Sequence, residues 1–128
     1  MSHGGDLEKV RGIAVGLPGV AERVSHGEPC FFVGQRPLCY FHDDRGGDGR
    51  VSLWCPAPAG VAEELAVNEP GRFFRPAPSA SGVFATWVGV YLDTTGADRV
   101  DWSEVAAIVE DAYRLIAPRR LVAELDGR

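Results

Sequence analysis

The sequence predicts a two-layer α+β domain in which an antiparallel sheet carries helices on one face. Both ends of the chain show apolar residues at helical spacing, and the middle shows short apolar and aromatic runs separated by glycine- and proline-rich turns. A chain of 128 residues suits one domain with one core, which we expect to span residues 1–128. The predicted order is helix, three strands, helix, two strands, helix.

The first predicted helix follows the N-terminus. Asp6 is a candidate cap for its start, and "LPG" at 17–19 ends the pattern. Its apolar stripe consists of Leu7, Val10, Ile13, Ala14 and Leu17.

Three short runs that follow are typical of strands. They are rich in aromatic and apolar residues, and a turn-rich loop at 43–49 separates the last two. The runs are "PCFFV" (29–33), "PLCYFH" (37–42) and "RVSLWC" (50–55).

The second half of the chain begins with a short predicted helix, "PAGVAEELAVNEPG" at 58–71, with acidic residues in its first turns and a Pro-Gly stop. Two strands follow, "RFFRPAP" at 72–78 and "FATWVGVYLD" at 84–93. In the second of these, strand alternation places Trp87, Gly89 and Tyr91 on one face and an all-aliphatic set on the other, which must face the core.

The strongest helix pattern is "DWSEVAAIVEDAYRLIAP" at 101–118. Asp101 and Glu104 have capping-box spacing, and a continuous apolar stripe follows them. A last short helix, "PRRLVAEL", is expected to start with Pro118 in its first turn.

Charge and composition limit the function. The net charge of -5 opposes approach to nucleic acid and to anionic membranes, so any such binding must be local. No apolar run is long enough to span a bilayer, and the N-terminus lacks the features of a secretory signal, so we expect a cytoplasmic protein without a membrane partner. Three cysteines inside strand-like runs, Cys30, Cys39 and Cys55, are expected to be free, buried thiols.

Several motifs in this order resemble the MmcQ/YjbR family of small bacterial proteins. The motifs are "LPGV" (17–20), "SHGEPCF" (25–31), "PGRFF" (70–74), "WVGVYLD" (87–93), "DWSE" (101–104) and "YRLIAPRRL" (113–121). The resemblance implies a CyaY-like, secretion-chaperone-like arrangement of the two layers, and it implies DNA binding.

Residues with catalytic or metal-binding chemistry are present but do not form a complete pattern. His26 and Glu28 could act as a base and its orienting carboxylate, yet no nucleophile or oxyanion donor accompanies them, so we interpret "SHGEP" as a turn into a strand. In "HDD" at 42–44 the first two side chains point to opposite faces of a strand. We therefore expect a non-enzymatic protein without a metal or cofactor.

Two sets of residues are candidates for binding. The first would contact the phosphates of DNA weakly and without sequence specificity, and consists of Arg72, Arg75, Arg114, Arg119 and Arg120. The second is a sheet face with Trp87, Tyr91 and Trp54. These side chains could stack on bases, or bind an unidentified small molecule or a protein partner. They could also form the interface of a dimer, or pack against other parts of the same chain.

Overall fold

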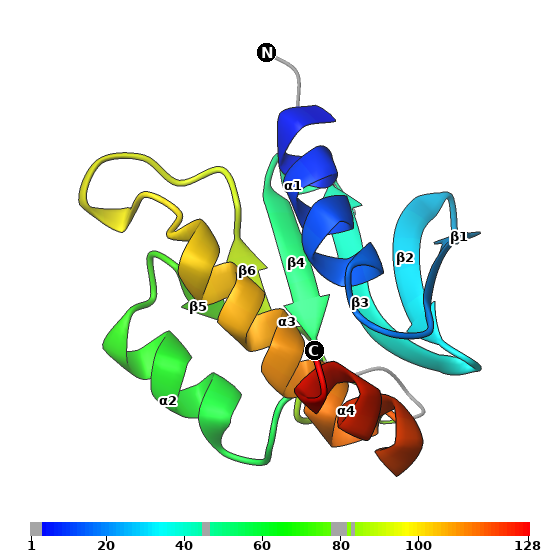
Figure 1. Cartoon of the computed structure of the whole chain (residues 1–128). Coiled ribbons are helices and arrows are strands. Elements are labelled where there is room, and N and C mark those ends of the chain that lie inside the picture. The colour runs from blue at the N-terminus through cyan, green and yellow to red at the C-terminus, as the bar shows by residue number, and fades with distance from the viewer. Residues whose placement is uncertain (1–3, 45–46, 78–81, 83) are drawn as a thin grey trace.

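The computed structural model describes residues 4–44, 47–77, 82 and 84–128. It has a six-stranded antiparallel sheet in the order β1-β2-β3-β4-β6-β5, with helices against one face (Figure 1). The predicted α+β class and two-layer architecture are therefore confirmed. The strands are β1 (Val20–Ser25), β2 (Glu28–Val33), β3 (Arg36–Asp43), β4 (Val51–Cys55), β5 (Phe73–Phe74) and β6 (Val88–Tyr91). The helices are α1 (Gly4–Val15), α2 (Val61–Asn68), the 3-10 turn η2 (Gly96–Asp98), α3 (Trp102–Ile116) and α4 (Arg119–Asp126).

Strand β1 is absent from the sequence-based prediction. It is the edge strand of the sheet, and its four central residues are exposed, so it lacks the alternation that identifies a half-buried strand. A tight turn joins it to β2 and contains the two residues His26 and Gly27, both with positive φ, at 52° and 81°. Positive φ at both central positions is the geometry of a type I′ hairpin, which confirms the turn predicted at "SHGEP".

The core lies between the sheet and the helices α1 and α3. On α1, Val10 and Ala14 have no exposed surface. On α3, the centre of the predicted stripe is buried, at Val105, Val109, Ala112 and Tyr113. The Tyr113 hydroxyl donates a hydrogen bond of 2.6 Å to the carbonyl oxygen of Pro18. This bond ties the far end of α3 to the turn that links α1 to β1.

The predicted cap of α3 is half confirmed. The Asp101 carboxylate accepts hydrogen bonds from the backbone N–H groups of Ser103 and Glu104, at 3.0 and 3.3 Å. The Glu104 carboxylate, however, binds Arg72 at the start of β5, so it stabilises the position of β5 against α3.

The strands of the second half are shorter than the sequence suggests. β5 includes only Phe73 and Phe74 of the predicted run, whose last residue, Pro78, lies outside the described residues. In β6, Val88 and Val90 face the core, followed by Leu92, as the alternation predicts. Among the helices that the structure describes, none has the length and apolar composition needed to cross a bilayer.

Candidate functional site

The sheet face opposite the helices is aromatic. Neighbouring ring centroids on this face lie between 4.3 and 6.4 Å apart, so the rings form one continuous layer. We call it the outer aromatic face. Its members are Phe32, Tyr40, His42, Trp54, Phe74, Phe84, Trp87 and Tyr91.

The structure brings Trp54, Trp87 and Tyr91 together on this face, as the sequence predicts, but packs them closely. Trp87 is only 6 % exposed and contacts Phe84 and Tyr40, at ring distances of 4.9 and 5.5 Å. Trp54 and Tyr91 are half-buried. Most of this aromatic surface therefore contributes to packing.

Gly89 shows how tight this packing is. The sequence suggests a gap between Trp87 and Tyr91 at this glycine, and the ring of Phe74 occupies it, at a position where any Cβ of residue 89 would overlap the ring. Phe74 then stacks on Tyr91 at 4.6 Å, and the Arg50 guanidinium lies 3.7 Å from the centre of the Tyr91 ring. Only glycine leaves room for this arrangement.

A histidine and a glutamate do form a pair, but the histidine is His42. Its Nδ1 donates to Glu28 Oε1 at 2.6 Å, and Glu28 Oε2 accepts from the backbone N–H of Asp43 at 3.2 Å. His26 stands exposed at the turn. Ser52 lies directly across from His42 in the sheet register, so a carboxylate, an imidazole and a hydroxyl share one row. His42 and Ser52 are 3 % and 4 % exposed, which leaves a substrate little access to this row.

Three of the five predicted phosphate-binding arginines have carboxylate partners. Arg72 binds Glu69 at 2.6 Å and also Glu104, and the Arg75 guanidinium lies 3.2 Å from a carboxylate of α2. Arg114 binds Asp126 of α4 at 2.8 Å. Each of these ion pairs reduces the positive charge that the arginine can offer to a phosphate.

The other two predicted arginines, Arg119 and Arg120, are exposed at the start of α4 and belong to a group that the sequence did not suggest. Arg36, after the β2–β3 turn, donates to the carbonyl oxygen of Ile116 at 3.2 Å, and Arg128 donates to that of Gly16 at 2.6 Å. We call Arg36, Arg119, Arg120 and Arg128 the arginine end.

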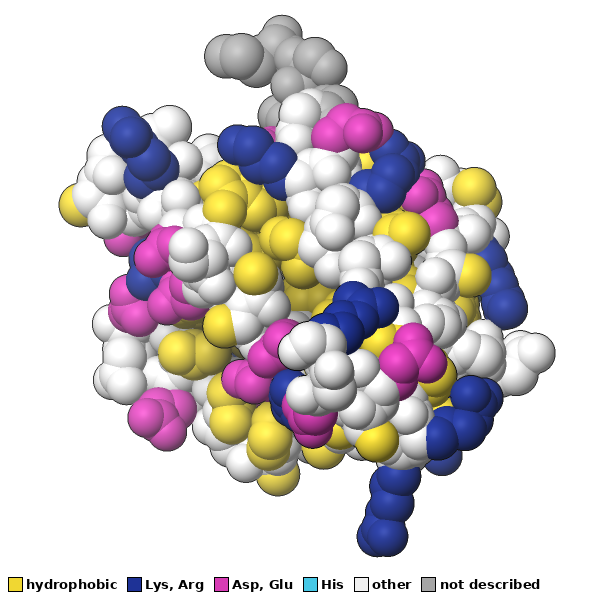
Figure 2. All heavy atoms as spheres, viewed as in Figure 1, with side chains coloured by type: hydrophobic (Ala, Val, Ile, Leu, Met, Phe, Trp, Pro, Cys, Tyr) yellow, Lys and Arg dark blue, Asp and Glu magenta, His cyan; other side chains and the backbone are white. Residues whose placement is uncertain are grey.

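Several observations place these arginines close together. Ile116 lies only three residues before Arg119, and α4 is short, so its two ends are about 10 Å apart along the axis and Arg128 follows two residues after its last residue, Asp126. Burial raises the pKa of the Tyr113 phenol, and the charge of Glu124 raises it further. The charges of Arg128 and Arg120 lower the same pKa, so both arginines lie near this phenol. Figure 2 shows Lys and Arg side chains around α4, with carboxylates beside some of them. Within the described residues, none of the four arginines makes an ion pair.

A pocket lies between α2 and α3, on the helical side of the sheet. Its volume is about 410 Å³, and apolar side chains from both helices and from the β4–α2 connection line most of it. Asp111 and Arg114 are its charged members. The sequence does not predict this site, and its local signal is "PAP" at 56–58, a rigid apolar connection between a strand and a helix.

The three cysteines are buried thiols, as predicted. Cys39 and Cys55 lie side by side on β3 and β4, and the hydrogen bond of the Cys39 thiol with Cys55, together with burial, raises the pKa of Cys39 well above its ordinary value. A high pKa disfavours the thiolate, the reactive form and the form that binds metals. In the part of the chain that the structure describes, no group of three or more His, Cys, Asp or Glu side chains could hold a metal ion.

Comparisons with known proteins give one family and one fold. The family model described as YjbR matches residues 15–115. The crystal structure of Deinococcus radiodurans protein DR2400, with a domain described as DUF419, is similar with a TM-score of 0.65 and 19 % sequence identity, over 94 % of this chain and 87 % of that one. No curated protein matches the chain.

Proposed function

The chain belongs to the YjbR family, and we propose that it is a non-catalytic binding protein that contacts nucleic-acid phosphates through the arginine end. The resemblance of its motifs to the family, which implies DNA binding, supports this proposal. The observation that carries this proposal is the contrast in ion pairing. Arg72, Arg75 and Arg114 are held by carboxylates, whereas the four residues of the arginine end are exposed and make no ion pair with a residue that the structure describes.

The form of the arginine end suits a phosphate backbone. Arginine guanidinium groups bind phosphate oxygens in a bidentate manner. Arg36 and Arg128 each have one hydrogen bond to a backbone carbonyl oxygen, which orders the side chain without neutralising it. Contacts of this kind hold a nucleic acid without reading its sequence.

The rest of the molecule keeps the interaction weak. The net charge of -5 repels a polyanion, and Glu124 lies within the same helix as two of the arginines. We therefore expect an affinity in the range of non-specific binders, with a Kd of roughly 10⁻⁴ to 10⁻⁶ M. Binding should weaken steeply as salt is added, because each phosphate contact releases counterions.

Fluorescence anisotropy with labelled duplex and single-stranded oligonucleotides tests the proposal, over a series of salt concentrations. Four phosphate contacts on duplex DNA give a log-log salt slope of about -3.6, at roughly 0.9 per contact. The double variant R119Q/R120Q should reduce the magnitude of the slope by about 1.8.

The matched control is R75Q/R99Q, which removes the same number of charges from exposed positions outside the arginine end. It should leave the slope unchanged and lower the affinity only slightly. Equal losses in both double variants would show that net charge alone governs binding. A flat response with every oligonucleotide at low salt would remove nucleic acid as the ligand.

A further inference from the structure

The pocket between α2 and α3 is the feature that the proposed function leaves unexplained. Its deepest residues are nearly fully buried: Ala57 is 7 % and Val88 is 1 % exposed. Val61 and Leu65 of α2 form one wall, and Ile108 and Leu115 of α3 form the other. At about 410 Å³ the pocket lies within the range of small-molecule sites in proteins.

The pocket stays open because of how α2 is anchored. This helix packs mainly on β5 and β6. The prolines at 56 and 58 give its connection to β4 a fixed backbone. Ala57 lies in this connection and lines the pocket, and its small side chain fills little of the space between the two helices. As a result Leu115 remains 50 % exposed at the mouth, although it is a large apolar side chain.

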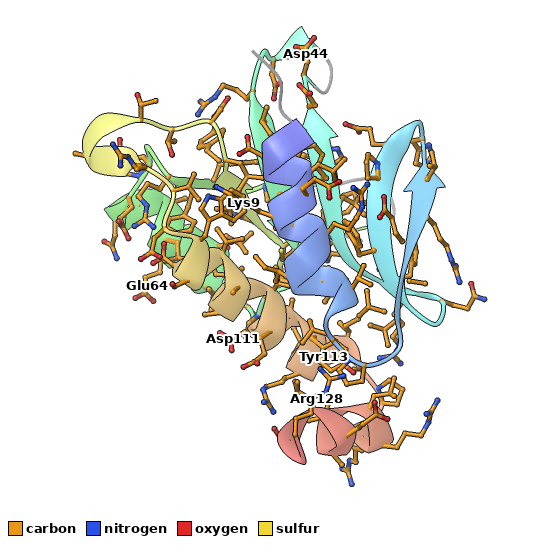
Figure 3. The ribbon with its side chains drawn as sticks, turned by 45° about the horizontal axis from the view of Figure 1, so that its top comes forward. Lys9, Asp44, Glu64, Asp111, Tyr113 and Arg128 are labelled. Carbon is orange, nitrogen blue, oxygen red and sulfur yellow. The ribbon has the colours of Figure 1, made fainter. Side chains whose placement is uncertain are left out.

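The charge at the mouth is negative. Arg114 is already held by Asp126 and by Glu110, at 2.8 and 3.7 Å. Asp111 is exposed and makes no ion pair with any residue that the structure describes. Figure 3 shows Asp111 and Glu64 on the same side of α3, so a second carboxylate lies on the facing helix. Glu64 is exposed one turn from Val61 and lies outside the pocket lining, so Asp111 is the carboxylate that reaches the pocket itself.

We propose that this pocket binds a small molecule that has an apolar body and one protonated amine. The apolar part lies between Leu65 and Leu115, and the ammonium group pairs with Asp111 at the mouth. The volume of the pocket suits a compact molecule, and its size favours this occupant over a whole amphipathic helix, which would need a longer apolar groove.

Three probes of nearly equal shape test the proposal by amide chemical shifts of the full-length protein: phenethylamine, 2-phenylethanol and 3-phenylpropionate. The amine should cause saturable shifts at the residues of the two pocket walls. It should bind more tightly than the alcohol by about two- to five-fold, which is the value of an exposed ion pair, and the carboxylate should bind most weakly.

The variant D111N should abolish the preference for the amine and leave the affinity for the alcohol unchanged. E124Q removes an exposed carboxylate outside the pocket and should retain the preference. L65W fills the mouth and should prevent binding of all three probes, with thermal unfolding used to check its fold.

Three results would overturn the proposal. The first is the absence of saturable shifts at the pocket walls with every probe at millimolar concentration. The second is an affinity for the carboxylate that equals or exceeds the affinity for the amine, which would show that Arg114 governs recognition. The third is binding of a basic amphipathic peptide at these walls together with no binding of the amine.

Discussion

Replacing Glu28 by alanine should destabilise the protein by about 2 to 4 kcal/mol, although Glu28 is the first residue of a strand that begins at the surface. The Glu28 side chain is 19 % exposed and accepts two hydrogen bonds, one from the buried imidazole of His42 and one from the backbone of Asp43. A hydrogen bond to a charged group is worth about 1.5 to 3 kcal/mol. Removal of the acceptor also leaves a buried ring nitrogen with its desolvation cost, about 1 to 3 kcal/mol.

The free energy of unfolding is measured by urea titration with tryptophan fluorescence, since Trp54 lies 4.3 Å from the His42 ring. E28Q keeps an acceptor at the same place but loses its charge, so it should cost less than E28A. H26N is the matched control from the same turn. Its stability should change by less than about 0.5 kcal/mol, because His26 is exposed and asparagine tolerates positive φ.

The reasoning would be refuted if E28A and H26N were equally stable, or if the loss in E28A were no larger than that in a surface variant such as E124A. Large and similar losses in E28A and H26N would instead point to the pair of His26 and Glu28 that the sequence suggested. An unchanged m-value in all variants is required for the comparison.

Three further predictions concern packing and pH. G89A should lose about 1 to 3 kcal/mol, because its Cβ would overlap the Phe74 ring; unaltered urea unfolding would contradict the packing described for the outer aromatic face. Tyr113 should titrate above the ordinary range of a tyrosine in an ultraviolet absorbance titration, because burial raises its pKa. The folded state then holds this proton more tightly than the unfolded state does. The stability that Tyr113 contributes is therefore complete below pH of about 10 and is lost as the pH rises through the pKa of the folded state. Y113F should remove this loss of stability at alkaline pH, and a loss that persists in Y113F would contradict the prediction. For Asp93, burial alone would raise the pKa, but hydrogen bonds from Arg50 and from the Val51 N–H lower it below its ordinary value. Its contribution is therefore present above pH of about 4 and disappears as the pH falls through the lowered pKa. D93N should cost about 1 to 3 kcal/mol at neutral pH and flatten the acid limb of the stability curve, and an acid limb as steep as that of the unmodified protein would argue against this account.

The elements that the sequence predicts correctly are those with one buried face. Helix α3 shows a full apolar stripe and a side-chain cap at Asp101, and β6 shows strict alternation, because each packs one side on the core. Strand β1 buries neither face, so no periodic pattern marks it. Its existence depends on hydrogen bonds to β2, which composition does not encode.

The candidate sites were harder to predict because they depend on contacts between residues far apart in the chain. Residues 70–92 and 112–123 contain no Asp or Glu, so the sequence indicates that Arg72 and Arg114 are free to bind phosphate. Their partners Glu104 and Asp126 lie outside those windows and approach only in the folded chain. The partnership of Glu28 with His42 arises in the same way, since strand pairing sets it across β2 and β3.

The exposed edge at β1 carries a risk that its side chains offset. An edge strand presents unpaired backbone groups that can template the addition of a strand from another molecule, which is the first step toward fibrils. Glu22 and Arg23 place opposite charges at its centre, and Arg11 of α1 holds Glu22 by hydrogen bonds of 2.6 and 2.8 Å. An incoming strand would have to displace this ion pair and accommodate two charges. We therefore expect the charged side chains of β1, which hide it from a search for alternating apolar residues, to disfavour the addition of a strand from another molecule.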